Sequence, residues 1–254
     1  PLRLTGAPVL TPEGFAPHAI TIEQGRISDT PAQEVDLTGY LVLPGIIDLH
    51  GDGFERHLTP RPSAPFDKAQ ALASAAAELA ANGITTAWFA QSWSWEGGFR
   101  SGAATEALLA ALSKTRATLL PDVRVQIRLE THVLPEHAAV RQAVTAHQVD
   151  YVVFNNHLPE AVDLFNASPD KFANWAAQHR LTSPQMMQLV RAAQEQDPEV
   201  DAALTRLAQD FAAQGLRMGS HDDPCAQTRK RFRGYGAAIC EFPISFDEIG
   251  RASC

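Results

Sequence analysis

From residue 41 onward, short apolar runs alternate with segments that carry apolar residues at helical spacing, and this alternation restricts the fold more than any other feature. The run over 41–50 is nearly continuous in apolar side chains, as a parallel strand covered on both faces requires. Apolar residues at helical spacing cover five ranges, namely 69–82, 105–120, 136–147, 184–195 and 199–213. Strands that alternate with helices form a parallel sheet, so we predict an α/β fold.

We expect six strands in this sheet, each followed by polar sequence. They end near His50, Ala90, Glu130, Asn155, Gly219 and Cys240. An open doubly wound sheet fits this number, and so does a (β/α)8 barrel that lacks its last two strands. Residues 1–43 differ, because short alternating runs and a tight turn at Gln24-Gly25 predict a small separate sheet. We therefore expect two domains, over 1–43 and 44–254.

Charge and cysteine content limit the function classes. The chain has 21 Lys and Arg against 29 Asp and Glu, a formal net charge of −8, which argues against binding nucleic acid or an anionic membrane through bulk charge. The three cysteines, Cys225, Cys240 and Cys254, lack CxxC spacing. They predict a reducing compartment, the cytoplasm, and no disulfide framework.

Potential metal ligands follow several of the predicted strands, and in an α/β barrel such strand ends surround one active-site mouth. His50 and Asp52 are two positions apart on an extended segment, so their side chains point the same way. Glu130, His157 and His221 come at the ends of later strands. This mixed nitrogen and oxygen set suits Zn²⁺, Mn²⁺, Fe²⁺ or Ni²⁺ and not a cysteine-rich structural zinc site.

Each of these residues also has a simpler interpretation. His50-Gly51-Asp52 alone would be a turn, Glu130 alone an ion-pair partner of an arginine, and a single histidine a hydrogen-bonded core residue. Asp222 and Asp223 would orient ligands or act as catalytic acid and base groups, and the alternative is that one of them caps a helix ahead of Pro224. The metal hypothesis is favoured because the candidates recur at equivalent strand ends.

A local basic cluster follows the first strand of the predicted barrel. Arg56, His57 and Arg61 lie in a proline-containing segment, and arginine side chains match phosphate oxygens, so we expect an anionic substrate there. Solvated surface arginines are the alternative. We interpret Trp88, Trp93 and Trp95 as packing residues. Four other histidines are expected to face solvent, namely His18, His137, His147 and His179.

Together these segments resemble a known family. Residues 43–50 are similar to the PGxxDxH signature that opens the metal-dependent amidohydrolase superfamily. A more specific likeness is to the alpha-D-ribose 1-methylphosphonate 5-triphosphate diphosphatases of phosphonate metabolism (the PhnM family). It is carried by segments 50–52, 55–57, 60–62, 128–130, 156–157, 220–223 and 241–243.

The resemblance implies a distorted (β/α)8 barrel over 44–254, a small β-sandwich portion over 1–43 and a binuclear metal centre. It places five residues as ligands, namely His50, Asp52, Glu130, His157 and His221. We expect two divalent ions, zinc first, with manganese, iron or nickel as alternatives. The implied reaction hydrolyses a ribose 5-triphosphate to the 5-phosphate and diphosphate. Superfamily members carry a further aspartate on the last barrel strand, which this sequence lacks, so we expect it to represent an N-terminal portion of such a barrel.

Two alternatives stay open at this point. One is a cyclic amidase or deaminase on the same scaffold, against which the basic cluster of Arg56, His57 and Arg61 argues. The other is an inactive, truncated metal-binding homologue, which the missing aspartate favours. As partners we expect a phosphorylated ribose, no nucleic acid and no membrane, with a homodimer as an open question.

Overall fold

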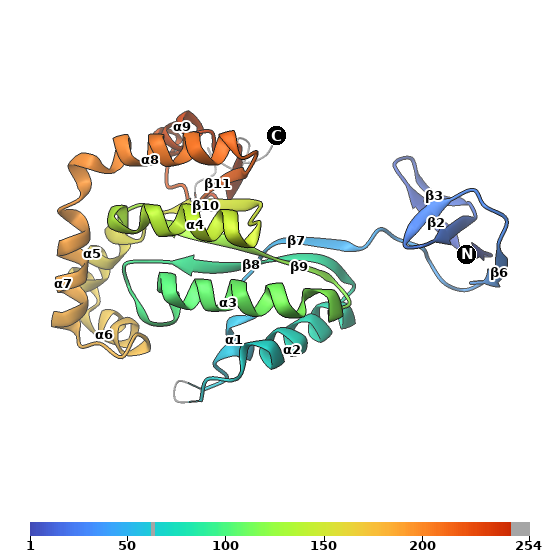
Figure 1. Cartoon of the computed structure of the whole chain (residues 1–254), viewed down its shortest axis with the longest axis horizontal. Helices are drawn as coiled ribbons and strands as arrows, with labels where there is room; N and C mark the ends of the chain where they lie inside the picture. The colour runs from blue at the N-terminus through green and yellow to red at the C-terminus, as the bar shows by residue number, and fades with distance from the viewer. Residues whose placement is uncertain (62–63, 245–254) are drawn as a thin grey trace. The chain divides into compact units, whose positions relative to one another are not determined.

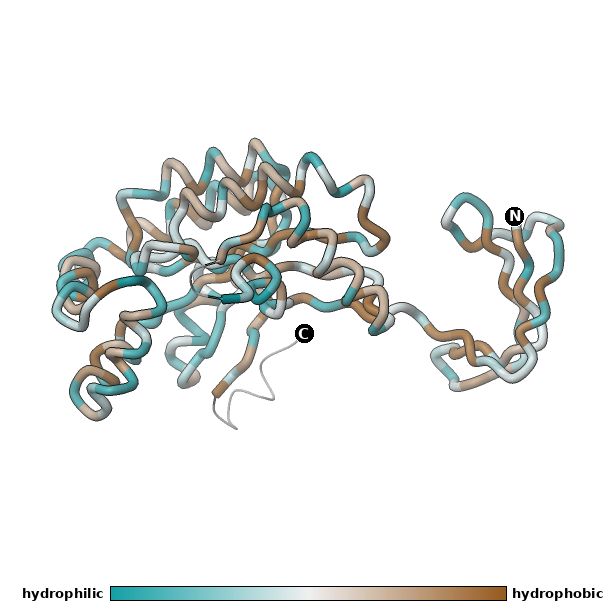
Figure 2. Tube along the Cα trace, turned by 90° about the horizontal axis from the view of Figure 1, so that it is seen from below, coloured by the Kyte–Doolittle hydropathy of each residue, from teal (hydrophilic) through white to brown (hydrophobic). Residues whose placement is uncertain are grey.

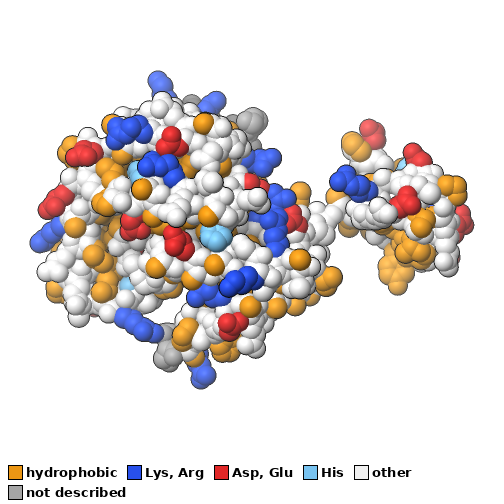
Figure 3. Space-filling view, viewed as in Figure 1, with side chains coloured by type: hydrophobic (Ala, Val, Ile, Leu, Met, Phe, Trp, Pro, Cys, Tyr) orange, Lys and Arg blue, Asp and Glu red, His pale blue; other side chains and the backbone are white. Residues whose placement is uncertain are grey.

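A computed structural model describes residues 1–61 and 64–244, and Figure 1 labels their helices and strands. The chain divides into two compact units, Pro1–Ile46 and Ile47–Cys254. Within the described ranges, no helix combines the length and the apolar character that crossing a bilayer requires. Acidic and basic side chains are interspersed on the face that Figure 3 draws.

Short strands form the first unit: β1 (Leu2–Thr5), β2 (Pro8–Thr11), β3 (Gly14–Pro17), β4 (Ile20–Glu23), β5 (Arg26–Ser28) and β6 (Gln33–Asp36). Four of them make a sheet in the order β5-β4-β1-β6, and β2 pairs with β3. Gln24 and Gly25 join β4 to β5 with φ angles of 49° and 74°, the positive values of a two-residue hairpin turn. The predicted turn is therefore confirmed.

The second unit contains one larger sheet with strands β7 (Ile46–Gly51), β8 (Ile84–Trp93), β9 (Asp122–Glu130), β10 (Tyr151–Asn155), β11 (Arg217–His221) and β12 (Ile239–Glu241). The strands follow one another across the sheet in chain order. Those from β8 to β12 pair in parallel. The α/β class and the six expected strands are confirmed.

This sheet is rolled. β7 and β12 are its two edge strands, yet His50 on β7 and Glu241 on β12 form a hydrogen bond of 2.7 Å between Nδ1 and Oε2. In a flat six-stranded sheet the edges would lie about 24 Å apart, since neighbouring strands are spaced by about 4.8 Å. The observed half-barrel favours the barrel over the open doubly wound sheet.

Longer helices accompany the strands: α2 (Lys68–Ala81), α3 (Gly102–Thr115), α4 (His137–His147), α5 (Leu158–Ala167), α6 (Pro169–Gln178), α7 (Ser183–Gln194), α8 (Asp197–Ala213) and α9 (Ala226–Gly234). Shorter turns of helix are α1 (Glu55–Leu58), η1 (Gly98–Arg100), η2 (Arg116–Thr118) and η3 (Leu134–Glu136). Along the helices, polar and apolar residues are intermixed (Figure 2). The five helical patterns of the sequence correspond to α2, α3, α4, α7 and α8.

Helices α5 and α6 have no counterpart in the sequence analysis. Each is 10 residues long, and each has proline in its first turn. Their apolar residues pack against α7 in a separate small core that contains Leu158, Phe172 and Met186. Because these helices bury their apolar faces against one another and not on the sheet, they fall outside the simple alternation of strands and helices.

The two faces of the rolled sheet differ in chemistry, and β9 shows this most clearly. Val125, Ile127 and their apolar neighbours belong to the main core, which also contains apolar residues of α2, α3, α4 and α8. Alternate residues point to the opposite face, since side chains alternate along a strand. On β9 these are Arg124, Gln126, Arg128 and Glu130. The polar face therefore lines the inside of the roll.

Two sequence interpretations need correction. His137 and His179 were expected to face solvent, but each is only 7% exposed. His137 begins α4, and burial, followed by the charges of Arg141 and Arg206, lowers its pKa to about 4. The interpretation of Trp88 and Trp93 as packing residues is confirmed, since they are 8% and 1% exposed.

Gly102 provides a test of the core packing. A Cβ at this position, the first residue of α3, would lie 2.5 Å from ring atoms of Trp93. We expect Gly102→Ala to lower the free energy of unfolding by about 1–3 kcal/mol, because the buried ring must shift. Denaturant unfolding followed by circular dichroism measures the change.

The matched control is Gly234→Ala, at the end of α9, where an added Cβ meets nothing within 4 Å. This variant should be unchanged or gain about 0.5–1 kcal/mol. Equal losses in the two variants would show that the Trp93 contact does not limit position 102.

His137 predicts a pH dependence of stability. Its pKa is lowered from 6.5 to about 4 in the folded chain, so as pH falls below 6.5 the unfolded state takes up a proton before the folded state does. Stability is therefore lost on acidification, by at most about 1.4 kcal/mol per pH unit. Relative to His137→Gln, wild type should lose stability between about pH 7 and pH 5 in unfolding measurements. His147→Gln, on the same helix, is the control and should follow the wild-type pH profile. If wild type and His137→Gln had identical pH profiles, the assignment to His137 would be contradicted.

Candidate functional site

Three side chains meet inside the roll, at the carboxyl ends of three strands. His50 comes from β7, His221 from β11 and Glu241 from β12, and they offer ligand atoms that lie within 4.8 Å of one another. The imidazole centroids of His50 and His221 are 4.8 Å apart. All three side chains are largely buried, with exposed fractions of 7–8%. The rolling of the sheet therefore produces a compact cluster of two imidazoles and a carboxylate.

Glu241 is held by donors on both carboxylate oxygens. Its Oε2 contacts His50 Nδ1 at 2.7 Å, and its Oε1 accepts hydrogen bonds of 2.7 Å from Tyr151 Oη and Gln126 Nε2. Burial and the charge of Glu241 raise the pKa of Tyr151, so its hydroxyl stays a donor. With Nδ1 bonded to a carboxylate, His50 presents Nε2 as its free ring nitrogen. This is the outer-shell arrangement that orients metal-binding histidines.

His221 lies beside Asp222, with Nδ1 3.0 Å from Oδ2. Burial lowers the pKa of His221, although the Asp222 carboxylate opposes this effect. The lowered pKa favours the neutral imidazole, which is the form that binds metals. Asp222 and Phe242 follow β11 and β12 with positive φ angles of 53° and 50°. These left-handed residues turn the chain at the rim, and the Phe242 ring packs against His50 at 5.1 Å.

Glu130 and His157 form a second buried group, at the ends of β9 and β10. His157 Nδ1 lies 2.6 Å from Glu130 Oε1, and Glu130 Oε2 accepts from the His157 backbone N–H and from the Trp95 indole. Burial raises the pKa of Glu130, but His157 outweighs this and leaves the pKa below its ordinary value. Arg128 donates to His157 Nε2 at 3.1 Å. Glu130 and His157 are thus joined by hydrogen bonds through both the side chain and the backbone of His157.

The two groups share one electrostatic neighbourhood. Arg128 acts on the pKa of His221, and Asp222 is influenced by both His221 and His157. The strand ends that the sequence singled out therefore do converge for His50, Glu130, His157 and His221. Their assignment as metal ligands stays a prediction.

Other predicted site residues lie apart from these contacts. Asp52 is exposed just after β7 and is not part of the three-residue cluster. Asp223 is fully buried and accepts hydrogen bonds from Ser220 Oγ and Cys240 Sγ, with Arg229 3.9 Å away. These contacts indicate that Asp223 stabilises the segment around His221.

The basic cluster after β7 has an internal acidic partner. Arg56 and His57 both contact Glu78 of α2, which offsets part of their positive charge. The Arg56 side chain remains 63% exposed, and Arg61 is also exposed. Their role in binding a substrate stays a prediction.

Glu241 is the site residue that sequence reasoning missed. It directly follows Cys240, where the sixth strand was expected to end, so it occupies the same kind of strand-end position as the predicted ligands. The rule that selected Glu130 would have found it, had the strand been extended by one residue.

The residues present fit a divalent cation. Imidazole nitrogens and carboxylate oxygens are donors that zinc and its neighbours in the first transition row accept. Among the described residues, His221 Nδ1 is a buried ring nitrogen without a well-oriented hydrogen-bond partner. Ligands of one zinc ion lie within roughly 4.2 Å of each other, and the cluster approaches that spacing.

One curated protein is similar to this chain over most of its length. The chain is 29% identical over 247 residues to alpha-D-ribose 1-methylphosphonate 5-triphosphate diphosphatase of Escherichia coli (strain K12). The match covers 91% of this chain and 61% of that protein. The resemblance to the phosphonate-metabolism diphosphatases, drawn above from short segments, is confirmed by this relative. The chain spans less than two thirds of the relative's length.

Solved structures give weaker matches, and no protein-family model matches the chain. A D-hydantoinase from Bacillus sp. AR9 aligns with 95% of this chain and 56% of its own, at 15% identity and a TM-score of 0.42. Another D-hydantoinase aligns with 98% of this chain and 60% of its own, at 14% identity and a TM-score of 0.43.

Tyr151→Phe tests the orienting role of Glu241. The substitution removes one of the two donors on Glu241 Oε1, so His50 is held less firmly, and we expect affinity for Zn²⁺ or Mn²⁺ to fall about tenfold. Competition with a coloured chelator measures the affinity. Tyr235→Phe is the control, because that hydroxyl bonds Asp201, remote from the cluster. Equal affinities in the two variants would remove the proposed link between Tyr151 and the metal site.

Proposed function

We propose that the protein is a metal-dependent hydrolase that cleaves a phosphoanhydride bond of alpha-D-ribose 1-methylphosphonate 5-triphosphate and yields the 5-phosphate and diphosphate. The observation that carries the proposal is the meeting of His50, His221 and Glu241 inside the roll, beside the pair of Glu130 and His157. The relative from Escherichia coli supplies the substrate. The proposal includes a barrel of the (β/α)8 type that lacks its last strands, and two ions, zinc first.

Several residues have defined tasks in this proposal. His50 and His221 hold the cation through ring nitrogens, and Glu241 fixes the orientation of His50. A bound divalent cation activates water and polarises a phosphoryl oxygen. Burial raises the pKa of Asp222, but His221 outweighs this and leaves the pKa below its ordinary value, so Asp222 is an ionised carboxylate at the rim that can accept a proton. Asp223 holds Ser220, next to His221, in place.

Charge on the substrate is offset by arginines. Arg56 is exposed enough to reach a polyphosphate, and Arg128 lies within the buried group next to His157. Such fixed positive groups stabilise charge that develops on transferring phosphoryl oxygens.

The test is diphosphate release from a ribose 5-triphosphate by protein loaded with Zn²⁺ or Mn²⁺, with ring opening of hydantoin assayed in parallel. We expect diphosphate and no ring opening. His221→Ala should reduce turnover by at least about 100-fold, because a metal centre supplies several kcal/mol of transition-state stabilisation.

The matched control is His147→Ala, on α4, which should keep wild-type turnover and metal content. Ring opening without diphosphate release would replace the proposal by the cyclic amidase. Metal binding with neither activity would replace it by an inactive homologue.

A further inference from the structure

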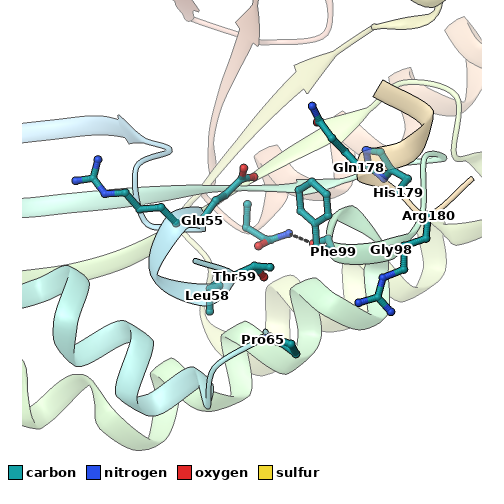
Figure 4. Close-up of a pocket in the computed structure, with 11 residues that line it drawn as sticks. Glu55, Leu58, Thr59, Pro65, Gly98, Phe99, Gln178, His179 and Arg180 are labelled. Carbon is teal, nitrogen blue, oxygen red and sulfur yellow. Dashed lines mark hydrogen bonds between the residues drawn. The ribbon is translucent and has the colours of Figure 1, made fainter. Parts of the chain in front are cut away.

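A cavity of about 550 Å³ lies between α1, η1 and the end of α6 (Figure 4). Glu55 and Thr59 line one side, and Phe99, Gln178, His179 and Arg180 line the other. Pockets for small ligands commonly measure about 300–1,000 Å³ and combine apolar walls with a few polar groups. The size and lining therefore fit one small organic molecule.

His179 supports the cavity wall from behind. Its side chain is 0% exposed, and Nε2 lies 3.4 Å from Glu96 Oε1. The ring stacks on Phe99, with the ring centroids 4.9 Å apart. His179 therefore holds Phe99 in position, and its side chain does not itself reach the cavity.

A carboxyl and an aromatic ring face the same space. In Figure 4 the Glu55 carboxyl points toward the side on which the Phe99 ring lies, and burial raises its pKa although Arg100 and Arg128 oppose this. A carboxylate has two oxygens and accepts from neighbouring hydroxyls. Phe99 is 39% exposed and offers an apolar surface. Hydroxyl acceptors beside an apolar ring are what a sugar requires.

The charges of the cavity decide which part of a substrate it takes. Glu55 on the wall and Glu96 behind His179 would repel a triphosphate. Arg180 also belongs to the lining and suits a single anionic substituent. Glu55 interacts electrostatically with Arg128, which donates to His157, so the cavity is coupled to the pair of Glu130 and His157. In this proposal the phosphate chain extends from the cavity towards that pair and the candidate metal site.

We propose that this cavity binds the pentose ring of a phosphorylated sugar: Glu55 accepts from ring hydroxyls, Phe99 packs on the carbon face with His179 behind it, and Arg180 meets an anionic substituent. The assignment rests on the proposed function for the reaction, and it adds the residues that select the sugar.

Binding of D-ribose 5-phosphate, measured by calorimetry on the full chain, tests the cavity without requiring turnover. Glu55→Gln and Phe99→Ala should each weaken binding at least tenfold. The matched controls are Glu160→Gln, at an exposed acid on α5, and Phe165→Ala, at a residue that is 38% exposed compared with 39% for Phe99. These controls should bind as wild type does. Equal binding by all variants, or no binding by wild type, overturns the assignment.

A kinetic comparison separates this proposal from the proposed function. Inorganic tripolyphosphate has the phosphoanhydride bonds but no sugar, so the ratio of kcat/KM for ribose 5-triphosphate to that for tripolyphosphate should fall at least tenfold in Phe99→Ala. A wild-type protein that cleaves neither compound, yet binds D-ribose 5-phosphate through Glu55 and Phe99, would refute the hydrolase and leave the sugar site standing. An unchanged ratio in an active enzyme would refute the sugar site alone.

Discussion

One buried carboxylate joins the two edges of the large sheet. Glu241 on β12 bonds His50 on β7, and its second oxygen is held by Gln126 and Tyr151 from the strands between them. Gln126 also donates to the backbone oxygen of Leu49 on β7. A buried charge of this kind is tolerated only when its oxygens are satisfied, and here the donors come from three strands. The same hydrogen bonds of Glu241 therefore hold the curvature of the sheet and assemble the candidate site.

One face of the large sheet packs against helices, and the other face carries polar and charged residues. Apolar residues of β9 pack with the helices, while Arg124, Gln126, Arg128 and Glu130 line the inside. The polar row runs along one strand toward the rim, where Glu130 meets His157. Arg128 of this row also acts on the pKa of Glu55, which lines the cavity proposed to bind a sugar. The pair of Glu130 and His157 and the proposed pocket thus share the charge of Arg128.

The sequence was sufficient for the features that repeat along the chain. Alternation of strands and helices predicted the parallel sheet, and strand-end positions predicted that His50 and His221 would converge. Contacts that depend on distant segments were not accessible. Nothing local to His179 indicates that Phe99 and Glu96 will bury it, and nothing local to Asp223 indicates the buried contact with Cys240. Helices α5 and α6 were missed because they pack in a separate core.

The bond between His50 and Glu241 spans 191 positions of the chain. Closing so long a loop is entropically unfavourable until the intervening strands have docked, so contacts of this range form late in folding. The cluster of His50, His221 and Glu241 therefore does not exist in a partly assembled chain in which only the first four strands of the large sheet have docked. The cation proposed for this cluster would stabilise only those molecules whose first and sixth strands have already come together.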